Sequence, residues 1–461
     1  MAVLAVGLAH TLHPGMPETA WTRCQRRRTA ATPVADAPAP TRPAVKGPLL
    51  VQFYNARLAT PEGLMEGELW MQQGKIVDAQ QRFWQREDSA ADCRIDCHGL
   101  ILAPGFVDVH MRGAFGVDFA SLHEATEDEA ERAIGTVCRR LPELGVTAFC
   151  PTLRGCSPEV YRRLLPRLMP RTGPRKAALV GVHLDGPFCT IGASPPSSLE
   201  GGWETLSATY GPALADGVAA AVTLAPELAG AAGAVEALQQ RGIVVGLGRT
   251  EASLDQCREA VRHGARLVSQ MLRDMPPFHH RDPGPLGLLV EEAQAQAKSV
   301  GDAAGDAAGG ARAVYYTMTL DDAHTHPAAL NLAQSTHPEG LIVASDSTRD
   351  MPRAASGATE AGKAPSAAVE EDDEDADAGT FAACVRHLHR HSGATDPSAA
   401  ILAGSLHPAE LLGLTSKGRL SHGADADLTL LDDSLQVRGC FVGGQLAWAH
   451  ADLHGALWFH R

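Results

Sequence analysis

Long apolar runs, aromatic side chains and paired cysteines are scarce in this sequence of 461 residues, and each shortage excludes a class of protein. No run of 18 or more apolar residues occurs, which argues against a membrane-spanning helix. Aromatic residues make up 5% of the chain and hydrophobic residues 44%, so a large core must be mainly aliphatic. The length is sufficient for a large barrel with a smaller attached domain.

The ten cysteines do not form a disulfide pattern. They are scattered singly, no CxxC motif occurs, and the closest two, Cys93 and Cys97, have three residues between them. This spacing is typical of reduced thiols in a cytoplasmic compartment. We therefore expect a cytoplasmic protein.

A basic surface is also missing. The net charge is −14, from 40 basic and 54 acidic residues, and seven of the acids lie in one run between Glu370 and Asp377. That run accounts for half of the net charge, and the remainder is ordinary for a soluble protein. Nucleic acid is not an expected partner, because its recognition needs a basic face.

Three segments have a composition unlike that of the rest. Residues 1–48 are rich in Ala, Pro and Arg, which predicts a disordered extension, with an organelle-targeting segment as the alternative. Residues 291–312 are rich in Ala, Gly and Gln, and we expect a helix that passes into a flexible loop. Residues 353–377 are Ala-rich and then strongly acidic, which is typical of a solvated insert.

Short apolar runs alternate with helix-like segments through the middle of the chain. This alternation is the pattern of a parallel α/β fold, and eight such units predict a (β/α)8 barrel. In that fold the residues that carry chemistry lie at the carboxyl ends of the strands. The runs that we expect to form the barrel strands are Leu102–His110, Thr147–Leu153, Ala178–Leu184, Ala221–Ala225, Ile243–Leu247, Arg266–Met271, Val314–Leu320 and Leu341–Ala344.

Strand-like stretches also flank this region at both ends. Leu49–Asn55 and Glu68–Val77 have turn residues between them, and Ala426–Leu431 and Val437–Trp448 show the same pattern near the carboxyl end. We expect the two sets to pair into one small β-domain. The predicted division is a β-domain of residues 49–100 with 417–461, and a barrel of residues 101–416.

The first barrel run ends in a histidine and an arginine. Alternate residues of a strand point the same way, so two histidines at this place could grip one metal ion. The chain has His110 and Arg112 instead. A guanidinium does not ligate a metal and repels one, so His110 stands alone here as a candidate ligand.

Two aspartates also stand at strand ends. Asp185 ends the third run and precedes Gly186 and Pro187, a position that suits a metal ligand as well as it suits a surface or capping role. Asp346 follows the eighth run, where it could act as general base toward a metal-bound water. A helix cap is the alternative for an isolated aspartate.

The segment after the sixth run offers a corner that could bind an anion. His279 and His280 precede Arg281, and an arginine can hold a phosphate with two parallel hydrogen bonds. The alternative is a loop packed by Pro277 and Phe278, in which the histidines are merely polar.

Several separated motifs resemble, in the same order, those of N-acetylglucosamine-6-phosphate deacetylases of the amidohydrolase superfamily. The resemblance is collinear from about Leu50 to Leu446, apart from the two low-complexity inserts. Ordered motifs in this number are much more specific than one short pattern. The motifs are Leu102–Asp108, Phe149–Leu153, His183–Phe188, Thr223–Glu227, Pro277–Gly284, His324–Leu330, Leu406–Ala409 and Gly423–Asp427.

The resemblance implies a reaction and the residues that serve it. The family hydrolyses the acetamide of N-acetylglucosamine 6-phosphate to acetate and glucosamine 6-phosphate, with a divalent metal that activates water. The aspartate that moves the proton matches Asp346, and the substrate-binding histidine matches His324 in the segment that begins at Asp321. The phosphate-binding arginine matches Arg281. Because that arginine often reaches into a neighbouring subunit, the resemblance also implies a homodimer.

The chain departs from the family pattern at the metal positions. The family holds its metal with a glutamate and two histidines. Asp185 stands at the glutamate position, Arg249 at the first histidine, and Gln270, a weak ligand through its amide oxygen, at the second. If the chain is active, the resemblance implies zinc, with His110 as a further candidate ligand.

Other departures fall on the same site, while the motifs of the fold are intact. Arg273 and Asp274 stand where the family has an Asn-Ala pair that meets the phosphate. Ala193 and Ser194 stand where it has an Ala-His pair. The Gly/Ser-rich loop after the last strand is replaced by the acidic insert.

Three interpretations follow from these substitutions. The first is an active deacetylase with a remodelled site, in which His110, Asp185 and Asp346 surround the metal. The second is a metal-poor protein that binds a sugar phosphate or a protein partner, in which the charge of Arg249 replaces that of the metal. The third is a hydrolase for a different N-acyl or cyclic amide substrate.

Overall fold

The computed structural model describes most of the chain after residue 48. The predicted extension and acidic insert lie outside the described residues. The structure describes residues 49–78, 91–192, 198–301, 314–321, 323–348, 380–451 and 453, with only the backbone for 296–301.

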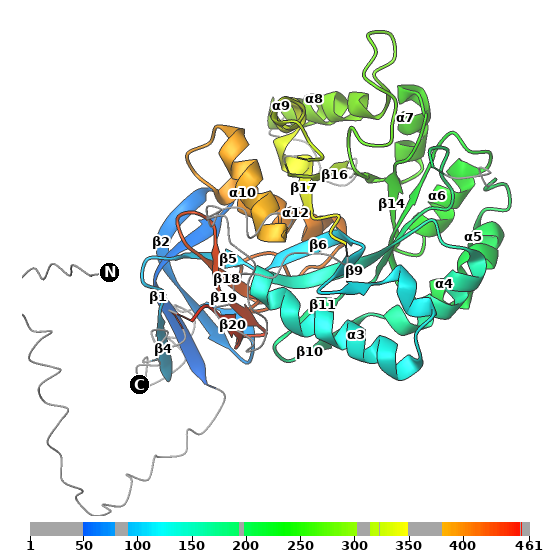
Figure 1. Ribbon diagram of the computed structural model, residues 1–461. Coiled ribbons are helices and arrows are strands. Elements are labelled where there is room, and N and C mark those ends of the chain that lie inside the picture. Colours follow the sequence, from blue (N-terminus) through cyan, green and yellow to red (C-terminus); the bar gives the residue numbers. More distant parts are fainter. Residues whose placement is uncertain are drawn as a thin grey trace, which may run out of the picture. The chain divides into compact units, whose positions relative to one another are not determined.

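Eight strands pair in parallel around a curved sheet, as the sequence predicts (Figure 1). The last strand is joined back to the first by backbone hydrogen bonds. The Asp346 N–H donates to the carbonyl of His110 at 2.9 Å, and the Arg112 N–H donates to that of Ser347 at 2.9 Å. The predicted barrel fold is confirmed. Its strands are β6 (Phe106–Met111), β9 (Val146–Arg154), β12 (Val182–Asp185), β13 (Ala219–Leu224), β14 (Val244–Leu247), β15 (Leu267–Val268), β16 (Tyr315–Thr319) and β17 (Leu341–Ala344).

Glycine residues divide two of the predicted strands. The first run is two strands, because the chain leaves one sheet at Gly105 and enters another. A Cβ at Gly105 would lie 2.2 Å from Oγ1 of Thr147, so only glycine allows this approach. The third run is divided at Gly181, whose φ is +137°. It forms β11 (Lys176–Leu179) and then β12.

Helices between the strands bury one face each, as α3 illustrates. It begins after Thr126, whose side chain forms a capping box with Glu129. Its buried residues Ala130, Ile134 and Val137 follow helical spacing, so one apolar stripe faces the strands. Figure 1 shows α3 to α7 outside the barrel strands. The helices are α3 (Glu127–Arg140), α4 (Pro158–Leu164), α5 (Trp203–Tyr210), α6 (Ala231–Gln239), α7 (Leu254–Arg262), α8 (Gly287–Gly301), α9 (Pro327–Thr336), α10 (Phe381–Ser392), α11 (Ser398–Ala403) and α12 (Leu406–Leu411).

The strand sets from the two ends of the chain share one smaller sheet, as predicted. β18 pairs antiparallel with β5, and β5 pairs parallel with β1, so the strands drawn in blue and red in Figure 1 lie side by side. The rings of Phe53 and Phe441 meet edge to face at 5.1 Å and join the two sets in its core. The strands are β1 (Leu50–Thr60), β2 (Gly63–Gln72), β3 (Lys75–Val77), β4 (Cys93–Asp96), β5 (Ile101–Pro104), β18 (Leu428–Leu431), β19 (Val437–Val442) and β20 (Gln445–Ala449).

An apolar cluster lies near the amino ends of the barrel strands. Leu267 and Tyr315 begin β15 and β16, and both pack in this cluster with Val107, Ile342 and Leu411 of α12. The amino ends of these strands therefore share an apolar layer, whereas the candidate functional residues lie at the carboxyl ends.

A helix leads into the first predicted insert. The helix expected at the start of the insert at 291–312 is confirmed by α8, and residues 302–313 lie outside the described part. Within the described residues, no helix is long and apolar enough to cross a membrane.

The short elements are β7 (Gly113–Ala114), β8 (Val117–Asp118), β10 (Arg171–Gly173), and the 3-10 helices η1 (Ala120–His123), η2 (Leu141–Leu144), η3 (Leu165–Leu168), η4 (Pro212–Leu214), η5 (Gly284–Leu286) and η6 (Pro338–Gly340).

Candidate active site at the carboxyl ends of the strands

Most of the residues predicted to form a site lie in two sets of polar contacts at the carboxyl ends of the barrel strands, where the fold places functional residues. The members of the first set are His110, Arg112, Gln270, Arg273 and Asp346. The members of the second set are Arg154, Asp185, Arg249 and Asp274. Because Arg273 and Asp274 are adjacent in the sequence, we call the two sets together the polar network.

Asp346 is held by three potentially cationic side chains. Nε of Arg112 lies 2.8 Å from Oδ1, Nη1 of Arg273 lies 2.8 Å from Oδ2, and Nε2 of His110 lies 3.4 Å from Oδ1. Burial favours the neutral acid, but the hydrogen bond with His110 and the charges of the imidazole and both guanidinia outweigh it. Together they hold the pKa of Asp346 well below its usual value. The carboxylate therefore stays ionised at physiological pH.

Gln270 faces an imidazole. Its Nε2 lies 3.3 Å from Nε2 of His110. The His110 ring also meets the ring of His183 edge to face at 4.9 Å. His183 is bonded to the Val109 carbonyl at 3.1 Å and to the Thr223 hydroxyl at 2.7 Å, and burial, followed by the nearby His110, lowers its pKa to about 3. The neutral ring of His183 therefore packs against the ring of His110.

Asp185 faces an arginine that the sequence analysis missed. Nε of Arg154 lies 3.5 Å from Oδ2 of Asp185, and the same guanidinium forms an ion pair with Asp274. Arg154 is the last residue of β9. The rule that strand ends carry function would have identified it, because it ends β9 as Asp185 ends β12.

The guanidinium of Arg249 lies close to the backbone of two glycines, Gly186 and Gly192. The residue is 8% exposed, and its Nη1 donates to the Asp185 carbonyl at 3.4 Å. Nη2 would lie 2.8 Å from a Cβ at Gly192, and Nη1 would lie 3.2 Å from one at Gly186. Among the described residues, no carboxylate pairs with Arg249 and its Nε has no partner. A buried charge without a counterion favours an anionic ligand.

The backbone is constrained at the same strand ends. Arg249, Gln270, Asp274 and Asp346 have φ values of 49°, 51°, 52° and 44°. Residues other than glycine rarely adopt this left-handed conformation, and those that do cluster at functional sites. The fold therefore aims these side chains at some cost in backbone strain.

Asp108 is a second functional candidate that the sequence analysis missed. It is fully buried on β6, and its carboxylate accepts from the Ser345 hydroxyl at 2.5 Å and from the His110 N–H at 3.0 Å. Burial raises its pKa to about 6, although both hydrogen bonds act in the opposite direction. Because Ser345 directly precedes Asp346, this bond fixes the position of the catalytic candidate. No local pattern distinguishes Asp108 in the sequence.

Three predicted substrate residues stand apart from the network. Asp321 and His324 bind each other, with Oδ2 2.8 Å from Nδ1, and form no hydrogen bond or ion pair with the described residues of the network. Arg281 is exposed, and its side chain bonds to none of the described residues. Ala193 and Ser194 lie outside the described residues.

The side chains in this network do not fit a divalent metal. The carboxylate of Asp185 faces Arg154, both oxygens of Asp346 face guanidinia, and Gln270 is turned to His110. In the part of the chain that the structure describes, no three His, Cys, Asp or Glu side chains come together as a metal site. Guanidinia beside a cation would repel it.

Comparison with known proteins decides the family. Residues 101–447 match the model of the Amidohydrolase family. The chain is 38% identical to the N-acetylglucosamine-6-phosphate deacetylase of Danio rerio, over 89% of this chain and 99% of the relative. It is 40% identical to the deacetylase of that name from Homo sapiens, over 87% of this chain and 96% of the relative.

The chain belongs to the N-acetylglucosamine-6-phosphate deacetylase family of amidohydrolases. Solved structures agree on the fold. The N-acetylglucosamine-6-phosphate deacetylase of Pasteurella multocida superposes with a TM-score of 0.63 at 19% identity, over 87% of this chain and 100% of the other. A mutant of the Mycobacterium smegmatis enzyme, in complex with N-acetyl-D-glucosamine-6-phosphate, gives 0.59 at 24% identity over the same shares.

Membership of this family makes the chain one of a group of hydrolases that generally depend on a divalent metal. The contacts of Arg249 and Gln270 do not suit a metal ion, so in this respect the site of this chain differs from what is general in its family. The fold and the family were predicted from the sequence and are confirmed. The individual roles of the site residues stay predictions.

Proposed function

We propose that this chain hydrolyses the acetamide of N-acetylglucosamine 6-phosphate, releasing acetate and glucosamine 6-phosphate in amino-sugar metabolism. The observation that carries the proposal is the 38–40% identity to deacetylases of that name over most of both chains. The proposed substrate is anionic, and four arginines lie at the barrel mouth. They are Arg112, Arg154, Arg249 and Arg273.

Asp346 is the group that we expect to take a proton from water and return it to the leaving amine. Its ion pairs keep it ionised, but they also lower its pKa and make it a weak base. Arg249 carries a buried positive charge that could stabilise the negative charge on the reacting carbonyl oxygen. We expect slow turnover, because a base of very low pKa removes a proton poorly.

The second candidate function is binding of the same sugar phosphate without hydrolysis. The observation that favours it is the pair Arg249 and Gln270 at the positions where the resemblance places metal-binding histidines. Arg249 has no counterion among the described residues, so a phosphate or another anion would complete its environment.

Acetate release from N-acetylglucosamine 6-phosphate tests the first candidate. Purified protein is assayed with added zinc, which is the ion we propose if a metal takes part, and again after treatment with a chelator. Asp346→Asn is the matched control, because it keeps the shape of the side chain and removes its charge. Unphosphorylated N-acetylglucosamine is the control for recognition of the phosphate.

Release that disappears in Asp346→Asn supports hydrolysis at this site. Absence of release, together with calorimetric binding of the same compound, supports the second candidate. A chain that is folded by circular dichroism and neither binds nor hydrolyses the compound contradicts both.

The proposal also includes a cytoplasmic homodimer. Arg281 is exposed and has no partner among the described residues, which would leave it free to reach a phosphate bound to a neighbouring subunit. A dimer that dissociates without loss of phosphate recognition would argue against this role.

A further inference from the structure

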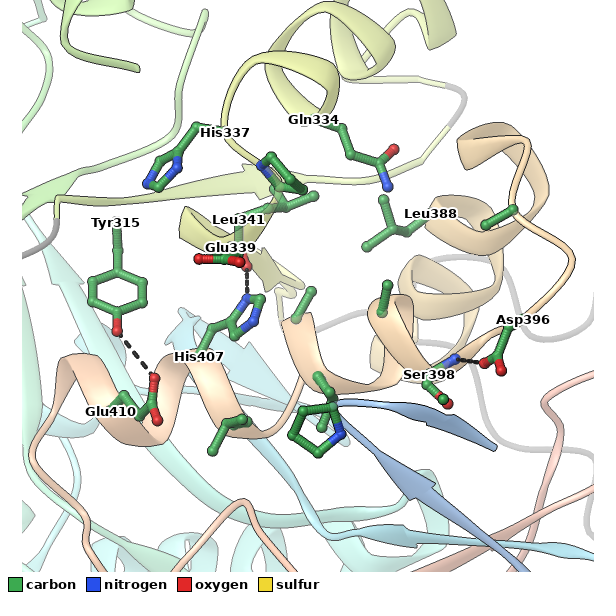
Figure 2. A pocket seen from close by; sticks show the side chains of 18 of the residues that line it. Tyr315, Gln334, His337, Glu339, Leu341, Leu388, Asp396, Ser398, His407 and Glu410 are labelled. Atoms are coloured by element: carbon green, nitrogen blue, oxygen red, sulfur yellow. Dashed lines mark hydrogen bonds between the residues drawn. The ribbon is translucent and has the colours of Figure 1, made fainter. Parts of the chain in front are cut away.

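A cavity lies at the amino ends of the barrel strands, opposite the candidate active site. It has a volume of about 580 Å³, within the range typical of small-molecule sites. Tyr315 and Leu341, the first residues of β16 and β17, form part of its wall (Figure 2). The rest of the wall comes from the turn between β1 and β2, from η6, and from helices α9, α10, α11 and α12. We name this cavity the basal pocket.

The charges of the basal pocket are all of one sign. Neither lysine nor arginine is among the described residues that line it, whereas four carboxylates are. Glu410 accepts from the Tyr315 hydroxyl at 3.2 Å and lies 3.8 Å from Arg419. The other three are Glu62, Glu339 and Asp396.

The carboxylates differ in how far the protein satisfies them. Asp396 accepts from the N–H groups of Leu64 and Ser398, both at 2.8 Å. Glu62 and Glu339 form no hydrogen bond or ion pair with any described residue. The pocket therefore holds negative charge that the described protein does not neutralise.

Two histidines of the wall each have one ring nitrogen that forms no hydrogen bond with the described residues. Nδ1 of His407 lies 2.7 Å from the Leu341 carbonyl, and Nε2 of His337 lies 3.0 Å from the Val314 carbonyl. A carbonyl can only accept, so each of these nitrogens carries a proton. Burial lowers the pKa of both imidazoles, which are therefore neutral. The remaining nitrogen of each ring is a lone-pair acceptor.

The acceptor that can meet a ligand is Nε2 of His407, because Figure 2 shows this ring beside Glu339 and Glu410. Nδ1 of His337 also has no partner among the described residues, but the protein encloses that atom and keeps it from the cavity. An imidazole acceptor set among carboxylates points to a ligand that donates hydrogen bonds.

We propose that the basal pocket binds a small organic ammonium ion with an apolar body. Figure 2 shows Glu339, His407 and Glu410 around the same space, where they would surround the ammonium group. Leu388 and Leu402 offer apolar surface for the body of the ligand. An ammonium group donates three hydrogen bonds and accepts none, which complements a lining of acceptors.

The same chemistry excludes other ligands. A phosphate or a carboxylate would meet four carboxylates and no cation, so the pocket does not suit the amino-sugar phosphate proposed for the barrel mouth. No three described His, Cys, Asp or Glu side chains converge as metal ligands would, so a molecular cation fits better than a metal ion.

The test compares three probes that share one aliphatic chain. Hexylamine, 1-hexanol and hexanoate are titrated calorimetrically into the full-length wild-type protein at pH 7. Hexylamine should bind at least about tenfold more tightly than 1-hexanol, because charge-assisted hydrogen bonds are the stronger ones. Hexanoate should not bind. Hexanoate that equals hexylamine, or hexylamine that does not bind at millimolar concentration, overturns the proposal.

Variants then locate the site. The double variant Glu339→Gln with Glu410→Gln should weaken hexylamine binding at least about tenfold. Glu159→Gln is the matched control, since Glu159 pairs with Arg162 on the surface away from the pocket, and it should leave the affinity unchanged. Unchanged affinity in the folded double variant overturns the assignment to this pocket. The comparison of probes needs no variant, so it remains decisive if the double variant does not fold.

Discussion

A single carboxylate illustrates how the surroundings decide what a residue can do. Asp346 is placed by β17 where a general base is expected, but Arg112, Arg273 and His110 occupy its two oxygens. The residue type and its place at a strand end could be predicted from the sequence. Its partners could not, because they come from other strand ends and from loops whose course only the fold decides.

Asp346→Asn should lower the free energy of unfolding by roughly 2 kcal/mol at neutral pH. The variant leaves the charges of Arg112 and Arg273 side by side without the buried carboxylate that they share. Urea denaturation measures the change. Glu159→Gln, which breaks an exposed pair with Arg162, is the control and should change stability by less than about 0.5 kcal/mol. A more stable Asp346→Asn protein would show that the carboxylate is not stabilised by these cations.

Asp108→Asn should change the pH dependence of stability. The pKa of Asp108 is raised from 3.8 to about 6 in the folded protein, so between these values the folded state holds a proton that the unfolded chain has lost. Stability from this group is therefore present at low pH and is lost as the pH rises through about 6. Relative to the variant, the wild type should lose about 2 kcal/mol between pH 4 and pH 6.

Chemical denaturation of both proteins across pH 4 to 8 measures this difference. It should become constant above about pH 7, where Asp108 is ionised in both states. A difference that does not vary with pH would mean that Asp108 has an ordinary pKa.

At the scale of elements, the strands could be predicted and their exact ends could not. All eight barrel runs contain a strand, because short apolar runs between helical segments leave few alternatives. Two runs each span two strands, because Gly105 and Gly181 break the strand where hydrophobicity continues. The sixth run, Arg266–Met271, was also too long, since its strand covers only Leu267–Val268. Arg154 was missed for a related reason, since the predicted strand stopped one residue before it.

The ends of β14 and β15 carry the substitutions that we interpret as a lost metal site. Arg249→His combined with Gln270→His should raise zinc affinity at least about tenfold, because it removes a repelling charge and adds two imidazole ligands, one beside Asp185 and one beside His110. Competition with a chromogenic zinc chelator measures the affinity. Arg249→Gln with Gln270 unchanged is the control, which removes the charge and adds no histidine.

No gain in bound zinc for the folded double variant would contradict the assignment of these two strand ends to metal positions. A gain in the control alone would show that the charge of Arg249, rather than the absence of ligands, keeps zinc out.

At the scale of the whole molecule, the two ends of the barrel offer opposite chemistry. The carboxyl ends of the strands carry four arginines around buried aspartates, and the basal pocket carries carboxylates and neutral imidazoles with no lysine or arginine among its described lining residues. The barrel and the terminal sheet provide the frame for both. We therefore expect anions at the carboxyl end and organic cations at the amino end.

Recognition of the sugar phosphate by Arg249 is tested most directly by calorimetric titration of N-acetylglucosamine 6-phosphate into protein freed of metal by a chelator. We expect saturable binding without metal, and binding at least about tenfold weaker in Arg249→Gln, because the buried guanidinium supplies the charge. Binding that appears only when zinc is added, or that is unaffected in Arg249→Gln, would contradict this expectation.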